Sequence, residues 1–341
     1  MKKYTIKDIA ELSGVSVATV SRVINNNGRF SEETREKVKK VIAETGYQPN
    51  YSAKSLRMNK SLSIGILVPD ITNSFFAEVV QKIEELFFLE GYTTIICHTS
   101  RNKDKEKIYL DILESKGVDG LVVISGAEEF DFEHFDNSEK IIPYICIDRA
   151  PKNKKNTIFI SSDHYQGARY ATEALIKSGS ASPIFISHHR KSTSRTERFK
   201  GFRDSLKENN IKFSSQSHYI SLDFDSENCE HELIDFFNKY PSTDGVFAVN
   251  DIVAVKVLKV LKRLNINVPG DLKIIGFDNT NLSENVSPKL SSVKQDTDKI
   301  ALYTVKNLLN LIVNPKNTGG TIKVPVSLKL RESTQDNLFH S

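Results

Sequence analysis

Polar side chains follow four apolar, β-rich runs of the sequence, at the points where the strands of a parallel sheet would end. Run 62–68 is followed by Asn73, Phe75 and Phe76, and run 144–147 by Asp148 and Arg149. Run 245–249 is followed by Asn250 and Asp251, and run 273–276 by Asp278. A carboxylate or an amide can hydrogen-bond neighbouring hydroxyl groups, and an aromatic ring can cover the C–H face of a sugar. Because ligands of α/β proteins bind where the carboxyl ends of strands converge, this pattern indicates a carbohydrate-binding cleft.

Several of these residues also have a purely structural interpretation. Asp251 could cap the helix expected at 251–264, and we favour that role over ligand contact. Asp148 and Asp278 could instead be loop carboxylates with local hydrogen bonds. One of the two adjacent phenylalanines should belong to the core.

The elements that would position these residues alternate from Leu62 onward, with short β-rich runs followed by longer helical patterns. We expect strands at 62–68, 93–97, 120–124, 144–147, 157–160, 183–187, 245–249 and 273–276. We expect helices at 76–90, 165–179, 197–209, 229–240, 251–264 and 297–312. Such alternation is typical of parallel sheets covered by helices. Because so many strands exceed one comfortable open sheet, we expect two α/β lobes, with the first break near 161–163.

The first sixty residues differ, with three short helical patterns and no strand-like run. Thr5 and Asp8 have the spacing of a capping box, Ser16 and Ser31 are suited to cap the second and third helices, and Gly14 should end the first. The apolar faces would be Ile6, Ile9, Ala10 and Leu12 in the first helix, Val17, Val20, Val23 and Ile24 in the second, and Val38, Val41 and Ile42 in the third.

Charge is unevenly distributed along the chain. Residues 1–60 carry 12 lysines and arginines against 6 acidic residues, whereas the remaining residues carry 35 against 37. A small basic head on a nearly neutral body is typical of a module that binds a polyanion such as DNA.

Ala10, Gly14 and Val20 have the spacing of a helix-turn-helix, which needs a small residue, a turn glycine and a branched apolar residue where two helices pack closely. Docked in this way, the second helix would place Val17, Ala18 and Arg22 nearest the base edges, and Arg22 could pair bidentately with guanine. The other candidate DNA contacts in the head, mostly short polar side chains suited to phosphates, are Thr5, Ser16, Thr19, Ser21 and Asn25. The alternative is a generic three-helix bundle with an exposed arginine.

These residues carry a family resemblance. The run TIKDIAELSGVSVATVSRVINN, followed by GYQPN, AKSLR, IGILVPDITNSFF, CIDR, FAVNDIVA and IIGFDN, resembles the lactose/galactose repressor family of bacterial transcription regulators. The likeness extends from Thr5 to Thr334. It implies an all-α helix-turn-helix head joined by a hinge to a two-lobed α/β core like that of periplasmic sugar-binding proteins.

The resemblance also assigns roles to particular residues. In the core it implies that polar contacts to the ligand come from Asp148, Arg198, Asn250 and Asp278, with Phe75 or Phe76 as an aromatic wall; Asn73 and Arg149 complete the candidate set. In the hinge it places Leu56 as a wedge between base pairs of the minor groove, supported by Asn50, Ala53, Lys54 and Arg57. The alternative for Leu56 is packing in the core of the head.

A hinge helix at 51–58 would be too short to persist alone, so we expect two copies to support each other in a dimer on DNA. The expected division is a head at 1–49, a hinge at 50–60 and a core at 61–341. Lobe one would comprise about 61–161 and 292–324, and lobe two about 162–291 and 325–341. The sequence shows no appended leucine heptads, which favours a homodimer over a tail-mediated tetramer.

Composition and motifs exclude several classes of function. No apolar run reaches the length of a membrane span or a secretory signal, so we expect a cytoplasmic protein. A dinucleotide fingerprint, a P-loop and a nucleophile elbow are all missing, which argues against an enzyme. His164, His188 and His189 do not have the spacing of a metal site, so we expect no cofactor. Cys97, Cys146 and Cys229 form no CxxC pair, so we expect reduced, buried thiols.

The sequence therefore predicts a regulator, most simply a repressor of sugar uptake or catabolism genes, with double-stranded operator DNA and a sugar or sugar phosphate as partners. A purine effector, a phosphorylated carrier protein as corepressor and an activator role are the alternatives within this class. A two-lobed sugar-binding protein without DNA-binding activity is a further alternative.

Overall fold

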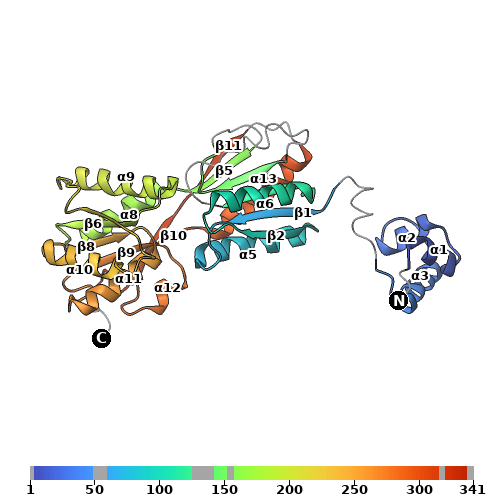
Figure 1. Ribbon diagram of the computed structural model, residues 1–341, viewed down its shortest axis with the longest axis horizontal. Coiled ribbons are helices and arrows are strands. Elements are labelled where there is room, and N and C mark those ends of the chain that lie inside the picture. Colours follow the sequence, from blue (N-terminus) through green and yellow to red (C-terminus); the bar gives the residue numbers. More distant parts are fainter. Residues whose placement is uncertain (1–3, 49–59, 125–141, 152–156, 315–318, 336–341) are drawn as a thin grey trace. The chain divides into compact units, whose positions relative to one another are not determined.

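The computed structural model describes residues 4–48, 60–124, 142–151, 157–314 and 319–335 of the chain (Figure 1). The chain forms two compact units, Met1–Ser61 and Leu62–Ser341. The hinge candidates Asn50, Ala53, Lys54, Leu56 and Arg57 lie outside the described residues. None of the helices that the structure describes is long and apolar enough to cross a membrane.

Within residues 4–48, the first unit has three helices: α1 (Ile6–Ser13), α2 (Val17–Ile24) and α3 (Glu32–Thr45). The predicted caps are confirmed, because the side chains of Thr5, Ser16 and Ser31 each accept a hydrogen bond from a backbone N–H in the first turn that follows. Gly14 ends α1 in the left-handed conformation, with φ 66°. This turn lets α1 and α2 pack closely around a core that includes Ile9, Ala10, Val20, Val23 and Val38.

The prediction that Leu12 lies on the core face of α1 is wrong, because its side chain is 56% exposed. Ile9, Ala10 and Ser13 form the buried face of this helix instead. Residues three, four and seven positions apart share one face of a helix, and Leu12 falls outside that series when it is counted from Ile6.

Each lobe of the second unit contains one sheet. The first sheet has the order β11-β5-β4-β3-β1-β2, with all described pairings parallel. Its strands are β1 (Ser63–Val68), β2 (Thr93–His98), β3 (Gly120–Ile124), β4 (Tyr144–Ile147), β5 (Thr157–Ser162) and β11 (Gly320–Val324). The second sheet has the order β12-β10-β9-β8-β6-β7 and is parallel except for the β10–β12 pair. Its strands are β6 (Pro183–His188), β7 (Tyr219–Leu222), β8 (Gly245–Ala248), β9 (Lys273–Asp278), β10 (Ser291–Lys294) and β12 (Ser327–Lys329).

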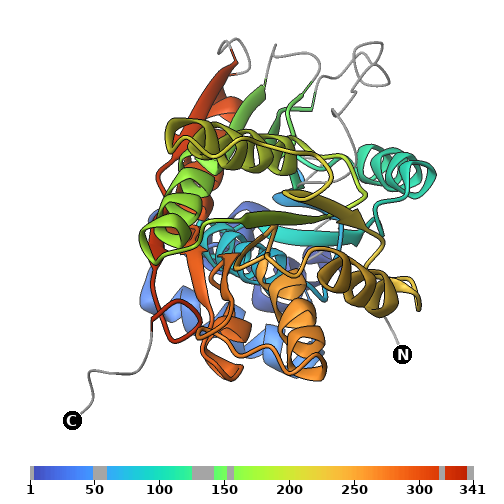
Figure 2. The same cartoon turned by 90° about the vertical axis from the view of Figure 1, so that its left-hand side faces the viewer.

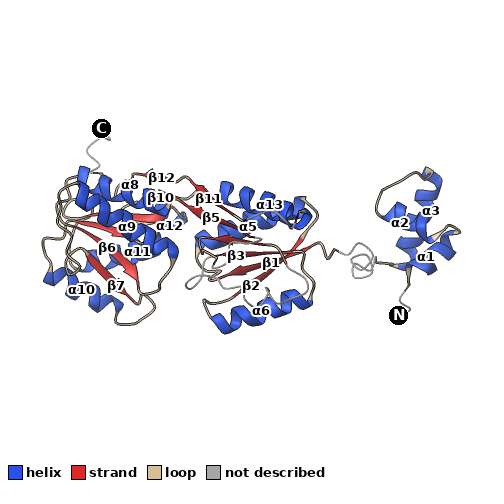
Figure 3. Ribbon diagram, turned by 90° about the horizontal axis from the view of Figure 1, so that it is seen from above, coloured by secondary structure: helices blue, strands red, loops and turns tan. Residues whose placement is uncertain are grey.

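Helices cover both faces of the first sheet. α5 (Ser74–Leu89) and α13 (Thr297–Val313) pack on one side, and α6 (Lys103–Ser115) packs on the other (Figure 3). The central strands β1 and β3 are therefore buried from both sides, which explains why they read as continuous apolar runs.

The second sheet is covered in the same way. Its strands lie between α8 and α9 on one side and α10 and α11 on the other (Figure 2). These helices are α8 (His164–Lys177), α9 (Thr193–Glu208), α10 (Cys229–Lys239) and α11 (Asp251–Arg263), and the short α12 (Asn281–Asn285) follows β9.

The chain passes between the two lobes three times in the described residues: from β5 to α8, from β10 to α13 and from β11 to β12. The first passage lies at Ser162–His164, beside the break expected from the sequence. β10 belongs entirely to the second sheet, so the second passage follows Lys294 rather than preceding 292.

Close packing of α8 against α9 depends on Gly201. A Cβ added at this position would approach the carbonyl oxygen of Tyr165 more closely than real Cβ atoms do, and it would lie 2.8 Å from the Cβ of Ala168. We expect Gly201→Ala to lower the free energy of unfolding of the core by about 1–3 kcal/mol, because the two helices must move apart. Urea unfolding followed by circular dichroism measures this change.

The matched control is Lys207→Ala, an exposed residue of the same helix, which should change the unfolding free energy by no more than about 0.5 kcal/mol. Equal stability of the two variants would show that the contact between α8 and α9 tolerates an added methyl group.

Candidate functional site

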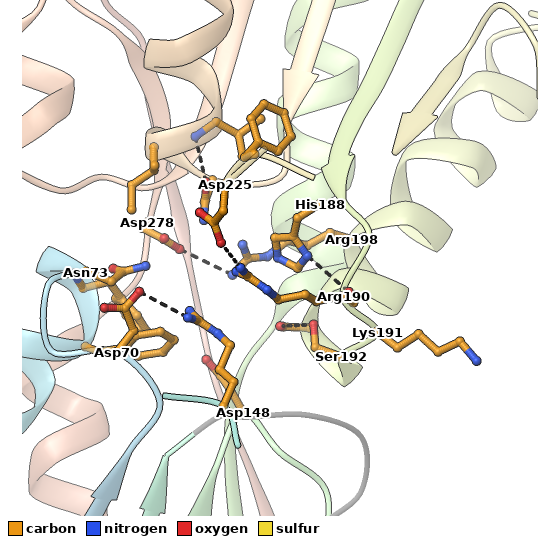
Figure 4. A pocket seen from close by; sticks show the side chains of 18 of the residues that line it. Asp70, Asn73, Asp148, His188, Arg190, Lys191, Ser192, Arg198, Asp225 and Asp278 are labelled. Carbon is orange, nitrogen blue, oxygen red and sulfur yellow. Dashed lines mark hydrogen bonds and ion pairs between the residues drawn. The ribbon is translucent and has the colours of Figure 1, made fainter. Parts of the chain in front are cut away.

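A cavity of about 600 Å³ lies at the carboxyl ends of the strands of both lobes (Figure 4). Seven of the eight ligand-binding residues predicted from the sequence line it: Asn73, Phe75, Phe76, Asp148, Arg198, Asn250 and Asp278. The other lining residues are Asp70, Ser100, Arg101, Lys103, His188, Arg190, Lys191, Ser192, Ser194, Phe224, Asp225, Ile252, Val253 and Lys256. The structure thus brings together side chains that are up to about 200 residues apart in sequence.

Lobe one contributes the aromatic part of the lining at the start of α5. Asn73 caps this helix by accepting a hydrogen bond from the backbone N–H of Phe75 at 3.0 Å. The rings of Phe75 and Phe76 lie 5.5 Å apart at an angle of 59°. Phe75 is buried in the core of lobe one while Phe76 is half-buried, so Phe76 is the ring better placed to face a ligand.

Arg198, on α9, is a buried cation surrounded by hydrogen-bond acceptors, a carboxylate and an aromatic ring. Its guanidinium donates to the Val249 carbonyl at 2.5 Å and contacts the Asp278 carboxylate at 3.4 Å. It also lies over the ring of Phe277, 3.6 Å from the ring centroid. Burial lowers the pKa of Arg198 from its usual value, whereas the carboxylates of Asp278 and Asp148 act in the opposite direction. The buried charge is therefore compensated by several partners.

Asp148 and His164 form a buried hydrogen bond of 2.8 Å that connects the lobes, because Asp148 follows β4 and His164 begins α8. Arg198 donates to Nδ1 of the same imidazole at 3.2 Å, so Nε2 carries the proton and donates to Asp148. Ser161 donates a further hydrogen bond to Asp148 at 2.9 Å. Burial alone would raise the pKa of Asp148, but His164 and Arg198 together hold it below the usual value. Burial lowers the pKa of His164.

Asp278 ends β9 and accepts a hydrogen bond from the Gln295 amide at 2.7 Å. Burial raises its pKa to about 7, even though Arg198 favours the ionised form. Asp278 therefore changes charge near neutral pH, whereas Asp148 stays ionised. This difference follows from their partners, because Asp148 has more hydrogen-bond donors around it.

The expectation that Asp251 caps a helix is wrong. Asn250 is the N-cap of α11, and its side chain accepts from the backbone N–H of Val253 at 2.9 Å. Asp251 is buried one position later and accepts hydrogen bonds from the Thr280 N–H at 2.6 Å and the Ser292 hydroxyl at 2.6 Å. Burial raises the pKa of Asp251 to about 6. It joins the ends of β9 and β10 and does not line the cavity.

Arg149 is the one predicted ligand-binding residue that does not line the cavity. Its side chain is 4% exposed and pairs with Glu106 of α6 at 2.8 Å. The sequence placed Arg149 correctly after β4, but it did not show that the chain bends there, where Asp148 has a positive φ of 55°. Asp148 lines the cavity, whereas the side chain of Arg149 contacts α6.

Two arginines of the cavity were missed by the sequence analysis. Arg101 follows β2 and pairs with Asp70 at 3.2 Å, and Arg190 follows β6 and pairs with Asp225. Both obey the rule that identified the other residues, since they come shortly after the end of a parallel strand. The signal was therefore present in the sequence.

The second site is the exposed side of α2 in the head. Ala18, Arg22 and Asn25 are exposed, whereas Val17 is partly buried against the core of the head. The Ser16 and Thr19 hydroxyls lie 2.9 Å apart, and Asn25 donates to the Ser21 carbonyl at 2.7 Å. Thr5 donates hydrogen bonds from its hydroxyl and from its backbone N–H to the carboxylate of Asp8.

The side chain of Arg22 has no hydrogen bond or ion pair within the part of the chain that the structure describes, and its aliphatic stem lies beside Gly28. An added Cβ on Gly28 would lie 3.2 Å from Cδ of Arg22. The guanidinium is thus displayed on α2 with its donors available.

A helix-turn-helix head followed by a two-lobed α/β core with a polar cavity defines a ligand-responsive, DNA-binding transcription regulator. Residues 5–50 match the family model described as bacterial regulatory proteins, lacI family, and residues 172–334 match that of a periplasmic binding protein-like domain. The chain belongs to the lacI family of bacterial regulatory proteins, which are regulators of transcription and not enzymes.

Similar proteins span the whole chain. The ribose operon repressor of Halalkalibacterium halodurans is 32% identical over 97% of this chain and 97% of its own length. The sucrose operon repressor of Streptococcus mutans is 36% identical over 96% of this chain and 98% of its own length. A crystal structure of the lac repressor dimer bound to operator and the anti-inducer ONPF has a TM-score of 0.84 and 26% identity, covering 98% of this chain and 99% of that one.

Asp278 should make the stability of the core depend on pH. Its folded-state pKa of about 7 exceeds that of an exposed aspartate, so the folded state holds a proton that the unfolded state releases. The contribution of Asp278 to stability therefore falls as the pH rises from about 4 through 7. We expect Asp278→Asn to remove this fall, so that the variant gains stability relative to the natural chain between pH 5 and pH 8.

Comparing the two proteins at each pH cancels the contribution of His164 to stability, which rises with pH because the pKa of His164 is lowered. Urea unfolding at pH 5 and pH 8 makes the measurement, and Asp235→Asn, an exposed carboxyl on α10, is the control. A stability difference between the natural chain and Asp278→Asn that does not vary with pH would show that Asp278 is ionised throughout this range.

Proposed function

We propose that this chain is a homodimeric, cytoplasmic repressor whose affinity for operator DNA is set by a sugar or sugar derivative bound between the two lobes of the core. The observation that carries this proposal is the cavity itself. It combines an aromatic wall from lobe one with carboxylate, amide and guanidinium groups from both lobes. That combination fits a compact polyhydroxylated ligand.

Of the similar proteins, the sugar-operon repressors support a sugar as the effector class, whereas the HTH-type transcriptional repressor PurR of Histophilus somni, 30% identical over 97% of this chain, does not. The sugar-operon repressors are those of a ribose operon and a sucrose operon, and both align with nearly the entire length of this chain. We propose that Asp148, Asn250 and Asp278 accept from or donate to sugar hydroxyls, that Arg198 fixes the two carboxylates, and that Phe76 covers an apolar face of the ring.

Ligand binding can change DNA affinity only through the arrangement of the lobes, because a molecule in the cavity is enclosed by core residues. The ligand must therefore bind one lobe arrangement more tightly than another. Asp148 and His164 lie on different lobes and share a hydrogen bond at the cavity edge, so a ligand that contacts Asp148 acts on the joint between the lobes. Linkage then requires operator DNA to change effector affinity by the same factor.

We propose that α2 reads the major groove. Arg22 would contact guanine, and Val17 and Ala18 would contact thymine methyl groups, although the partial burial of Val17 limits its reach. Thr5, Ser16, Thr19, Ser21 and Asn25 would hold phosphates. The exposed guanidinium of Arg22 supports this assignment.

We propose a hinge at 50–60 between a head at 1–49 and a core at 61–341. Leu56 would enter the minor groove, with Asn50, Ala53, Lys54 and Arg57 beside it. This part of the proposal rests on the sequence and the family, since these residues lie outside the described ranges.

The surface of lobe one supports a homodimer. Ile96 on the edge strand β2 and Ile108 and Ile112 on α6 are 40–58% exposed, which is unusual for isoleucine unless another surface covers it. Two copies of the head would then match a two-fold symmetric operator. A regulator of bacterial transcription works where the chromosome is, which supports a cytoplasmic location.

Arg22→Ala should weaken operator binding by about 1–3 kcal/mol while changing the affinity for random DNA much less, because a base contact is lost. The operator can be obtained by selecting random duplexes on the purified chain. Titrations at one fixed salt concentration then compare operator with random DNA.

Arg29→Ala is the matched control, because Arg29 is an exposed arginine of the head beyond the end of α2. It should change both affinities by a similar, small factor. Equal losses on operator and random DNA in the Arg22 variant would mean that Arg22 contacts only phosphate.

Arg198→Lys should weaken the response of operator binding to the effector. The lysine keeps a positive charge between Asp148 and Asp278 but loses the planar fork that reaches Val249 and His164. We expect operator affinity within about threefold of the natural chain, whereas the effector concentration for half-release rises at least tenfold. Operator-binding titrations with a panel of sugars and sugar derivatives test this.

Arg203→Lys, on the same helix but outside the cavity, should respond to effector like the natural chain. An unchanged response in Arg198→Lys would place the effector outside the cavity. A response to purines alone would reject a sugar as the effector class.

A further inference from the structure

The cavity has a cationic end that the proposed sugar contacts do not use. Six lysine and arginine side chains line the cavity against four aspartates, so the lining carries an excess of positive charge. Arg101 enters from lobe one and Arg190 from lobe two. Figure 4 shows Arg190 extending into the cavity, next to His188 and Ser192. A neutral sugar can accept hydrogen bonds from these side chains but brings no negative charge to offset the excess.

Each of the two arginines is held by one carboxylate and keeps most of its donors. Arg101 uses Nη1 for Asp70, and Arg190 uses Nη2 for Asp225. A guanidinium has five N–H donors, so both side chains can bind a second anion without giving up the carboxylate. The carboxylates therefore orient the arginines instead of saturating them.

The loop that carries Arg190 is fixed by another arginine. Arg195 donates from Nη1 to the backbone carbonyls of His189 at 3.0 Å and Arg190 at 3.1 Å. His188 ends β6 directly before this loop, and burial together with the charges of Arg190, Arg195 and Arg101 lowers its pKa to about 4. His188 is therefore neutral at physiological pH, and the charge of Arg101 acts on it from the opposite lobe.

Hydroxyl groups and a helix N-terminus lie at the same end. Ser192 caps α9, and its hydroxyl lies 3.2 Å from that of Ser194. Both serines line the cavity. The first N–H groups of a helix have no partner within the helix and favour an anion.

We infer that the effector is a phosphate monoester of a small sugar, with its phosphoryl group bound between Arg101 and Arg190 beside Ser192 and Ser194. The three phosphoryl oxygens can accept from two guanidinium groups and two hydroxyls, and a phosphate monoester carries more negative charge than a carboxylate. The carboxylate and aromatic part of the cavity would hold the sugar ring. This inference rests on the proposed effector role of the cavity.

The placement of the two arginines also suggests how such an effector would act. Each arginine is paired with a carboxylate of its own lobe, so an anion bound by both guanidinium groups would add a contact that joins the two lobes. A phosphorylated effector therefore favours the arrangement in which the lobes are closest. A neutral sugar in the same cavity lacks this effect.

The test compares matched pairs on the full-length chain by calorimetry: ribose and ribose 5-phosphate, fructose and fructose 6-phosphate, and glucose and glucose 6-phosphate, with inorganic phosphate as a further probe. We expect at least one ester to bind tenfold or more tightly than its parent sugar. Arg101→Gln and Arg190→Gln should each reduce that preference about tenfold. Arg203→Gln, on α9 outside the cavity, should leave it unchanged.

Operator release by the same compounds separates this inference from the proposed function. If the parent sugars bind and release the operator as well as their esters do, the cavity is the effector site but the phosphoryl position is rejected. If neither an ester nor inorganic phosphate binds more tightly than the sugars, the inference is overturned. If the esters bind but never change operator affinity, the phosphoryl position stands and the effector role falls.

Discussion

A buried guanidinium needs hydrogen-bond acceptors or negative charges around it, and Arg198 is such a group beside the joint between the lobes. Its partners come from the end of β8, the start of α8 and the end of β9, and Phe277 lies against its flat face. Arg198 is buried, so losing one of these partners would leave part of its charge uncompensated, which is unfavourable. The strand ends that line the cavity are therefore held in position by one side chain, which makes the cavity a preorganised site rather than a gap between lobes.

The polar groups around Arg198 divide into those that fix the structure and those that face the cavity. Both carboxylate oxygens of Asp251 accept hydrogen bonds, one from Thr280 and the other from Ser292. Asp251 thus connects β9 to β10 and does not line the cavity. Asp148 and Asp278 have burial similar to that of Asp251 but open onto the cavity. Three carboxylates close to one arginine thus have different tasks, decided by which hydroxyls and backbone groups lie beside each.

Most of the core could be predicted from the sequence because parallel strands buried on both faces read as apolar runs, as in Leu121–Ile124. β10 escaped prediction because it begins with Ser291 and Ser292, whose hydroxyls are satisfied by Thr334 and Asp251 rather than by water. The edge strands β11 and β12 are short and largely exposed, so they lack an apolar pattern. For the site, the position of a residue after a strand could be predicted, but not the direction of its side chain. That distinction separates Asp148 from Arg149 and Asn250 from Asp251.

The three passages of the chain between the lobes have a consequence for how the protein is made. Lobe one needs β11 at 320–324 to complete its sheet, and lobe two needs β12 at 327–329. A ribosome that has synthesised β1 must therefore add about 260 further residues before either sheet is complete, which takes roughly 15–50 s at ~5–20 residues per second. During this time the apolar strands of both lobes lack their final neighbours, whereas the head, whose last helix ends at Thr45, can already be folded. Nascent chains of this protein should therefore depend on chaperones for the core and not for the head.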